Sequence, residues 1–379
     1  MSHRRPTGMP PAHGLLVRAA LGAFPLTPAV ALALILTACS TAPDGSGQQP
    51  SGPTGAASRG EFSVPVLTVG TGQPTATATL TPTALPPPTP TPPPIPPPTP
   101  TLTLPGGGTT VFPDRRLVGF SGYPGAPALG RLGVGNLDER GADITALAGE
   151  YAAGRRPLPV FELIATVVHS RPGADGLYRT RIDEGVVRRH LEAARRHGAI
   201  LLLNIQPGRA AFLDEVKHWE PWLREPDVGL ALDPEWAVTA GQVPGKVFGR
   251  TTGAELDAIA AYVAGIVAPN RLPEKVMVYH QLSRSIVREP SGLQPHPGVT
   301  LVVSVDGIGS RAQKAATWRS IVAETPDHVH KGFKLFYDED AQIGPLMTPA
   351  EVLALTPQPE YVRSEERRVG KECYALCRS

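Results

Sequence analysis

Two acidic residues follow one short apolar segment, in Val228-Gly-Leu-Ala-Leu-Asp-Pro-Glu235. Because side chains alternate between the faces of a β-strand, Asp233 and Glu235 are expected on the face of the small residues, opposite the bulky Val and Leu side chains. Neighbouring carboxylates repel each other when both are ionised, so one of them is expected to hold a proton. Glycoside hydrolysis uses such a pair. The pattern therefore predicts Glu235 as general acid, with Asp233 orienting it or positioning a substrate acetamide that acts as nucleophile.

Polar residues also stand at or near the ends of the other apolar segments. Asp306 would share a strand face with Ser304, and Asp338 with Lys334, so either acid is a candidate for a second catalytic carboxylate. The remaining candidates, expected to bind substrate, are Tyr123, Glu162, Gln206, Trp236, His280, Gln281, Tyr337 and Glu339. The alternative for the acids is that they cap a following helix or loop.

Two of these residues have specific structural alternatives. Glu162 lies early in its segment, where a bare charge is costly, so it needs a partner such as Lys334 or substrate; a buried structural ion pair is the alternative. His280 is either a catalytic group or a hydrogen-bonded structural histidine.

Seven short segments rich in Val, Ile and Leu are predicted to be the strands that position these residues. They are 117–123, 160–168, 200–206, 228–235, 276–281, 300–306 and 333–338, with an eighth candidate near 359–362. Most are followed by a turn and a helical pattern, with capping-box sequences at Thr252, Ser310 and Thr348. The fold class predicted is an α/β protein with a (β/α)8 TIM-like barrel, in which sites lie at the C-terminal ends of the strands. An open doubly wound sheet is the alternative, although no GxGxxG follows the first strand.

The chain between Trp236 and Arg250 is long and contains Gly241, Gly245 and Gly249. Its length and glycine content suit a loop that folds over the site. A disordered insertion is the alternative.

The N-terminus carries an export signal. Arg4, Arg5 and Arg18 precede an apolar run, and Leu36-Thr-Ala-Cys39 resembles the lipobox of bacterial lipoproteins, which implies cleavage before Cys39 and lipidation on it. The apolar run is too short for the alternative, a transmembrane helix. We therefore expect residues 1–38 to be a signal peptide and the protein to be anchored by lipid on the extracytoplasmic face of the cell membrane.

Composition divides the rest of the chain. Of its 379 residues, 44 are Pro and 40 are Gly, and residues 39–110 are a Pro/Thr/Gly-rich stretch without apolar periodicity, which predicts a disordered, semi-rigid linker. Residues 111–362 are expected to form the barrel domain. Residues 363–379 depart from the preceding pattern and resemble peptides translated from sequencing-adaptor sequence; a genuine basic tail is the alternative.

Charge and cysteine content exclude several classes of function. The net charge of +2, without a basic stripe, argues against nucleic acid as a partner. Cys373 and Cys377 form an isolated CxxxC that is a poor zinc signature, so neither a metal nor a cofactor is expected. A weaker possibility is a divalent cation held by Asp233, Asp306 and Asp338. The domain is expected to be a monomer.

Four stretches carry a resemblance to a known family. Phe-Ser-Gly-Tyr-Pro-Gly (120–125), Asn-Ile-Gln-Pro-Gly-Arg (204–209), Leu-Asp-Pro-Glu-Trp (232–236) and Lys-Leu-Phe-Tyr-Asp-Glu-Asp (334–340) resemble a family of bacterial surface lipoproteins of unassigned activity. The domain of that family is similar to glycoside-hydrolase TIM barrels, which implies fold and location more than substrate. The Asp-x-Glu is also similar to that of chitinase-like and lysozyme-like barrels, although the fuller DxxDxDxE pattern of chitinases is absent.

These observations predict a lipid-anchored glycoside hydrolase that acts on extracellular or cell-wall polysaccharide, such as a peptidoglycan-type glycan. The alternative is a catalytically inactive barrel that binds carbohydrate or another wall component.

Overall fold

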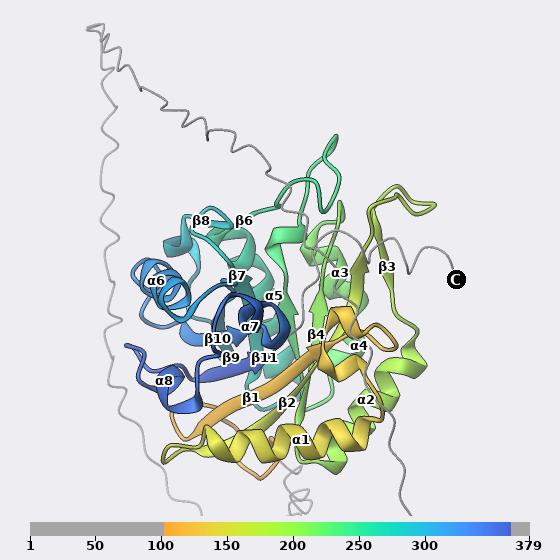
Figure 1. Cartoon of the computed structure of the whole chain (residues 1–379). Coiled ribbons are helices and arrows are strands. Elements are labelled where there is room, and N and C mark those ends of the chain that lie inside the picture. Colours follow the sequence, from red (N-terminus) through yellow and green to blue (C-terminus); the bar gives the residue numbers. More distant parts are fainter. Residues whose placement is uncertain (1–101, 365–379) are drawn as a thin grey trace, which may run out of the picture. The chain divides into compact units, whose positions relative to one another are not determined.

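The computed structural model describes residues 102–364, which form a closed barrel of eight parallel strands surrounded by helices (Figure 1). The barrel strands are β1 (Arg115–Gly122), β2 (Arg156–Val168), β4 (Ile200–Ile205), β5 (Val228–Leu232), β7 (Lys275–Gln281), β9 (Val299–Val305), β10 (His330–Leu335) and β11 (Tyr361–Ser364). Because β1 pairs in parallel with both β2 and β11, the sheet has no free edge at that point. The predicted (β/α)8 architecture is confirmed, and the open sheet is excluded.

Helices cover the outside of the barrel. They are α1 (Leu137–Glu150), α2 (Glu184–Arg196), α3 (Phe212–His218), α4 (Glu220–Leu223), α5 (Gly253–Asn270), α6 (Arg311–Val322), α7 (Tyr337–Ile343) and α8 (Pro349–Leu353). Ser310 and Thr348 form complete capping boxes, as predicted, whereas at Thr252 only the side-chain half of the cap is present. None of the helices in residues 102–364 combines the length and apolar character needed to cross a membrane.

Three short strands and four 3-10 turns complete the elements. The strands are β3 (Arg179–Arg181), which pairs antiparallel with β2, and β6 (Thr251–Thr252) with β8 (Val287–Arg288), which pair with each other. The 3-10 turns are η1 (Pro127–Leu129), η2 (Arg131–Gly133), η3 (Pro234–Trp236) and η4 (Pro290–Gly292). No α-helix lies between β7 and β9, where a regular barrel would have one; β8 and η4 occupy that connection.

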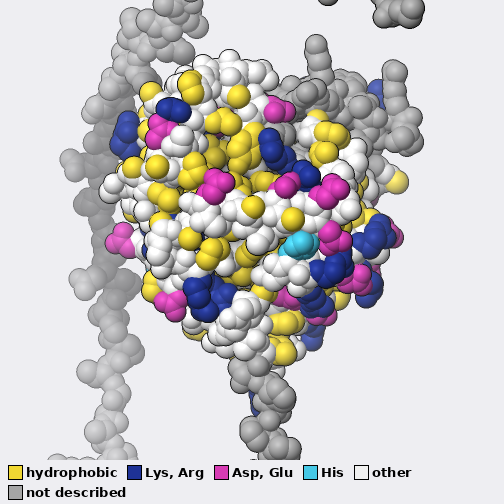
Figure 2. Space-filling model, turned by 60° about the horizontal axis from the view of Figure 1, so that its bottom comes forward, with side chains coloured by type: hydrophobic (Ala, Val, Ile, Leu, Met, Phe, Trp, Pro, Cys, Tyr) yellow, Lys and Arg dark blue, Asp and Glu magenta, His cyan; other side chains and the backbone are white. Residues whose placement is uncertain are grey.

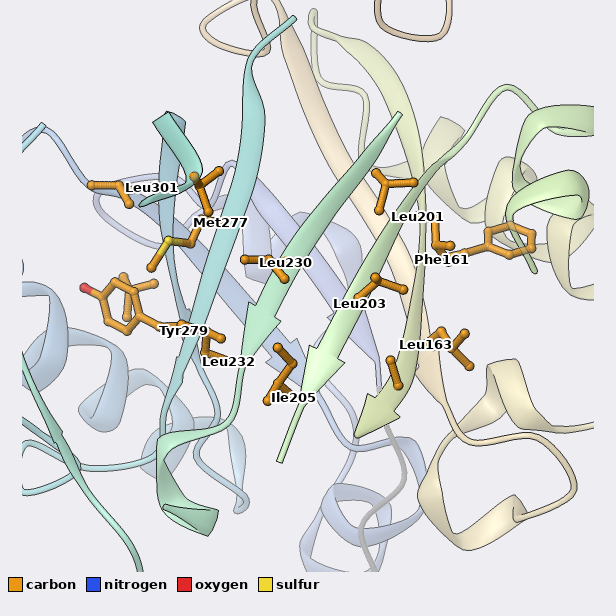
Figure 3. Close-up of a cluster of buried hydrophobic side chains, with 14 of the residues drawn as sticks. Phe161, Leu163, Leu201, Leu203, Ile205, Leu230, Leu232, Met277, Tyr279 and Leu301 are labelled. Atoms are coloured by element: carbon orange, nitrogen blue, oxygen red, sulfur yellow. The ribbon is translucent and has the colours of Figure 1, made fainter. Parts of the chain in front are cut away.

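The two faces of the strands bury two different cores. Outward-facing side chains, among them Leu203, Leu230 and Met277, pack toward the helices (Figure 3). Inward-facing side chains such as Leu202, Ala231 and Val278 fill the lumen of the barrel. The predicted alternation along β5 is therefore confirmed for Leu230, Ala231 and Leu232.

The segment that precedes β1 closes the N-terminal pole of the barrel. Leu104 and Val111 are buried in the lumen cluster, and the Val111 amide donates to Glu274 Oε2 over 2.8 Å. The Arg115 guanidinium donates to Pro105 O over 2.6 Å. Leu104, in the stretch that the sequence assigns to the linker, thus packs into the barrel, while residues 102, 103 and 106–110 are exposed.

The other end of the domain also extends past its predicted boundary. Strand β11 continues to Ser364, so Arg363 and Ser364 lie in the barrel wall and not in a separate tail. The signal peptide, the lipidation site at Cys39, residues 39–101 of the linker and residues 365–379 lie outside the described residues.

Charges of both signs are interleaved on the face of the molecule shown in Figure 2, with hydrophobic side chains between them. No extended basic surface is visible on that face.

Candidate active site

Asp233 and Glu235 lie together at the C-terminal end of β5. The strand ends at Leu232, earlier than predicted, and Glu235 belongs to the turn η3. The turn nevertheless keeps the two acids close: a carboxylate oxygen of each and a ring nitrogen of His280 all lie within 4.8 Å of one another. Both acids are 2% exposed. The predicted proximity of the two carboxylates is present, although the turn and not strand alternation produces it.

His280 projects from β7 into the lumen between three carboxylates. Its Nδ1 contacts Asp233 Oδ1 directly and lies 3.3 Å from Asp306 Oδ2, and its Nε2 lies 3.3 Å from Glu162 Oε1. Burial and the nearby Arg363 lower the pKa of His280, but the three carboxylates outweigh them and raise it to about 10. The ring is therefore an imidazolium at neutral pH, with a carboxylate at each nitrogen.

Asp233 is held as a carboxylate. Burial favours its neutral form, but the positive charge of His280 and a hydrogen bond from the ring lower the pKa of Asp233 below its ordinary value. Gln206 Nε2 donates to Asp233 Oδ2 over 3.1 Å, while Gln206 Oε1 accepts from the Val168 amide over 3.2 Å. Gln206 thus fixes the orientation of Asp233 from the neighbouring strand.

Glu162 is completely buried in the lumen. Its carboxylate accepts from the Arg363 guanidinium, from Tyr361 Oη over 3.0 Å, from Asn204 Nδ2 over 2.9 Å and from Ser121 Oγ over 3.2 Å. Burial would raise its pKa, but Arg363 and His280 lower it far below the usual range. A cation was expected beside Glu162, and Arg363 contacts it directly, while the positive charge of Lys334, the partner named from sequence, also lowers its pKa.

Asp306 lies at the end of β9 and pairs with Lys334 of β10, with Nζ and Oδ2 2.8 Å apart. Ser304 Oγ donates to its other oxygen over 2.6 Å, and Arg363 Nη2 lies 3.3 Å from Oδ2. Despite complete burial, these cations hold the pKa of Asp306 well below its usual range. Asp306 points inward as predicted, but its oxygens are occupied by protein groups.

Asp338 is not on a strand. Strand β10 ends at Leu335, and Tyr337 begins helix α7, so the predicted strand phase that would place Asp338 beside Lys334 is wrong. Asp338 is exposed on the first turn of α7. The buried acid of that helix is Asp340, which pairs with Lys314 across 2.9 Å.

The other predicted substrate-binding residues lie on the rim. Tyr123, Trp236, Tyr337 and Glu339 are half-buried in segments that follow β1, β5 and β10. Tyr337 lies under the Arg131 guanidinium, 4.3 Å from the ring centroid to Cζ. Gln281 is the neighbour of the inward-facing His280 on β7, and its amide donates to Ser283 O over 3.3 Å. Strand alternation therefore turns Gln281 away from the lumen.

The donor set of Asp233, Glu235 and His280 fits a divalent cation only if the imidazole is neutral. The three carboxylates raise the pKa of His280 to about 10, which favours the protonated ring over a neutral metal ligand. The alternative set of Asp233, Asp306 and Asp338 is not assembled, because Asp338 is exposed on α7.

Sequence reasoning missed Tyr361 and Arg363 as members of the site. Both face the lumen from β11, two residues apart, and both contact Glu162. Tyr361 and Arg363 are two positions apart, as residues on the same face of a strand must be, and this spacing could have identified them. The change in composition at residue 363 led instead to the prediction that the domain ends at Val362.

No protein-family model matches the sequence, and no curated protein matches it. Among solved structures, the chain is similar to the spore coat polysaccharide biosynthesis protein spsE of Bacillus subtilis, at 11% identity and a TM-score of 0.32 over 66% of this chain and 59% of that chain. A GH18 chitinase from Pseudoalteromonas aurantia matches at 10% identity and a TM-score of 0.31, over 69% of this chain and 98% of the chitinase. A putative chitinase A from Streptomyces coelicolor matches at 10% identity and a TM-score of 0.33, over 69% and 94%. The chain thus spans less than two thirds of the spsE protein, and none of these likenesses carries an argument about activity.

Proposed function

We propose that the protein is a glycoside hydrolase in which Glu235 is the general acid. The observation that carries this proposal is the placement of Glu235 within 4.8 Å of Asp233 at the C-terminal end of β5, the pole where (β/α)8 enzymes have their active sites. His280 holds Asp233 ionised, and a second negative charge so close to it would be costly. In this proposal Glu235 is the member of the pair that donates a proton to the leaving oxygen.

Asp233 acts as a positioning residue in this proposal. Its carboxylate is engaged by His280 and Gln206, so it is not free to attack a sugar carbon. Asp306 is likewise engaged by Lys334 and Ser304. With both carboxylates occupied, the nucleophile is best supplied by the substrate, and an acetamide next to the anomeric carbon does so in some glycosidases. The proposed substrate is a glycan that contains N-acetylhexosamine.

A second candidate is a catalytically inactive barrel that binds such a glycan. The extent of the ion network favours it, because Glu162, Asp233 and Asp306 are all compensated by protein cations, as in a purely structural core.

We also propose that the protein acts outside the cytoplasm, held by a lipid on Cys39. Cys39→Ala should release the full chain from the membrane fraction of the expressing cell into the soluble fraction. If the variant stays in the membrane fraction, this location mechanism is wrong.

Hydrolysis is tested with the full chain and a panel of soluble glycans that includes chitotetraose and cellotetraose. Release of reducing ends that is lost in Glu235→Gln supports the enzyme. If the wild type cuts none of the glycans but binds one, and Glu235→Gln binds it equally well, the inactive barrel is favoured.

A further inference from the structure

Most of the large hydrophobic side chains that remain exposed lie in connections that follow the C-terminal ends of barrel strands. Within residues 102–364 they are Leu102, Val134, Val247, Phe248, Ile308 and Ile343. All except Leu102 follow the C-terminal ends of barrel strands, after β1, β5, β9 and β10. This is also the pole of Glu235. An exposed apolar side chain at the pole of a candidate active site is in a position to contact a ligand.

Phe248 is the most exposed of these side chains, at 57%. It lies in the connection from β5 to β6, which begins directly after the turn that carries Glu235. The next residue, Gly249, donates its amide to Glu235 O over 2.7 Å. The residue after Phe248 is thus hydrogen-bonded to the backbone carbonyl of the proposed acid, which fixes the backbone next to Phe248.

The close approach of the loop to η3 requires a glycine. A Cβ on Gly249 would lie 2.3 Å from Ala237 O, and the Arg250 amide donates to that same oxygen over 3.1 Å. These contacts hold the two residues after Phe248 against the chain that follows Glu235.

The outer part of the loop is also fixed. The Arg209 guanidinium donates to Gln242 O over 2.6 and 2.9 Å, and the Val238 amide donates to Gly208 O over 2.9 Å. The loop is therefore an ordered support and not a disordered insertion. An aromatic ring on an ordered support binds with a small loss of conformational entropy.

The aromatic residue predicted to contact sugar was Trp236, but its surroundings differ from those of Phe248. Trp236 is half-buried, and a Cβ added to Gly245 of the same loop would lie 3.9 Å from its Cζ3. Trp236 is therefore less exposed than Phe248.

We infer that Phe248 is a specificity-determining residue of the proposed hydrolase, which packs against the apolar face of a sugar ring next to the ring whose bond is cut. This inference rests on the proposed function. The substrate class that it implies is an extended glycan whose pyranose rings present C–H faces, bound across the apolar rim.

The test uses the full chain in the Glu235→Gln background, so that binding is measured without cleavage, with chitotetraose and cellotetraose as probes in calorimetry. Phe248→Ala should weaken the Kd of the better probe by roughly 5- to 20-fold, as expected for the loss of an aromatic contact. Phe248→Trp should restore it. Leu102→Ala, a truncation of an exposed hydrophobic residue that precedes β1 and lies outside the proposed rim, is the matched control and should change Kd less than about twofold.

Each outcome decides the inference. An unchanged Kd in Phe248→Ala overturns it, as does a parent protein that binds neither probe. If the wild type cuts a probe but Phe248→Ala leaves its KM unchanged, the inference fails while the proposed function stands. If Phe248 contributes to binding but no glycan is cut, the rim is a carbohydrate-binding surface and the hydrolase is wrong.

Discussion

Asp233 Oδ1 and His280 Nδ1 are in direct contact at the floor of the candidate site. The contact joins the ends of β5 and β7 and, through the other ring nitrogen, reaches Glu162 on β2. A single charged ring therefore connects three strands of the barrel.

The protonation of His280 should make stability depend on pH. Because its pKa is raised to about 10 in the folded state, from an unfolded value near 6.5, its contribution is complete below about pH 6.5 and is lost as pH rises toward 10. The difference in unfolding free energy between wild type and His280→Gln, measured with urea at pH 6, 8 and 10, should therefore shrink as pH rises. Lys275, whose pKa burial lowers to about 7, acts in the opposite direction but is common to both proteins and cancels. A difference that stays constant would contradict the charged ring.

Removal of the proposed acid should affect activity and not folding. Glu235→Gln keeps the size of the side chain but cannot donate a carboxylic proton, so kcat on a cleaved glycan should fall by about 10²- to 10⁴-fold. The thermal midpoint should change little, and Glu192→Gln, on the exposed face of α2, is the control for a charge change alone. A kcat within tenfold of the wild type would exclude Glu235 as the acid.

The pair of Glu162 and Arg363 should be important for stability. Replacing Arg363 with Met leaves the Glu162 carboxylate buried without its principal cation, which should cost about 3 to 5 kcal/mol of unfolding free energy. Arg284→Gln breaks an exposed pair with Glu324 and should cost at most about 1 kcal/mol. Chemical denaturation compares the two variants. If Arg363→Met is as stable as the wild type, residue 363 is not an integral part of the barrel.

Gly119 should not tolerate a side chain. A Cβ at this position on β1 would lie 2.2 Å from Val160 O on β2, so Gly119→Ala must push the two strands apart and should cost about 3 kcal/mol or more. Gly149→Ala is the matched control, because the added methyl meets nothing within 4 Å near the end of helix α1, where alanine is favoured by about 0.5 to 1 kcal/mol. In thermal unfolding, Gly119→Ala should lower the midpoint relative to the wild type, and Gly149→Ala should raise it.

Chelators should have no effect on the folded protein. A divalent cation among Asp233, Glu235 and His280 would need the neutral ring of His280 as a ligand, and the raised pKa of His280 favours the protonated ring. Treatment with EDTA should leave the thermal midpoint and any glycan cleavage unchanged. A saturable rise in the midpoint on titration with Zn²⁺ or Mg²⁺ at pH 7 would show that a metal displaces the proton.

The strands could be predicted from sequence because each is a short apolar run, and along β5 the small Gly229 and Ala231 also marked the inward face. Leu230, Ala231 and Leu232 lie as the alternation requires. The alternation of side chains stops where a strand ends, and the sequence does not show where that is. Glu235 therefore belongs to a turn and Asp338 to a helix.

The partners of the buried charges were harder to predict, because pairing inside a barrel depends on register between strands that are distant in sequence. Lys334 lowers the pKa of Glu162 as a nearby charge, but it bonds Asp306, and the cation in direct contact with Glu162 comes from a position 201 residues away. The absence of a helix between β7 and β9 was not predicted either, because the barrel was inferred from the number of strands, which does not depend on that helix.

The packing of Leu104 and Val111 into the N-terminal pole fixes the side from which the polypeptide enters the domain. Whatever is attached ahead of Leu102 therefore meets the barrel at the end away from Glu235 and Phe248. A bulky polymer bound at the pole of Glu235 and Phe248 would therefore not pass Leu104 and Val111.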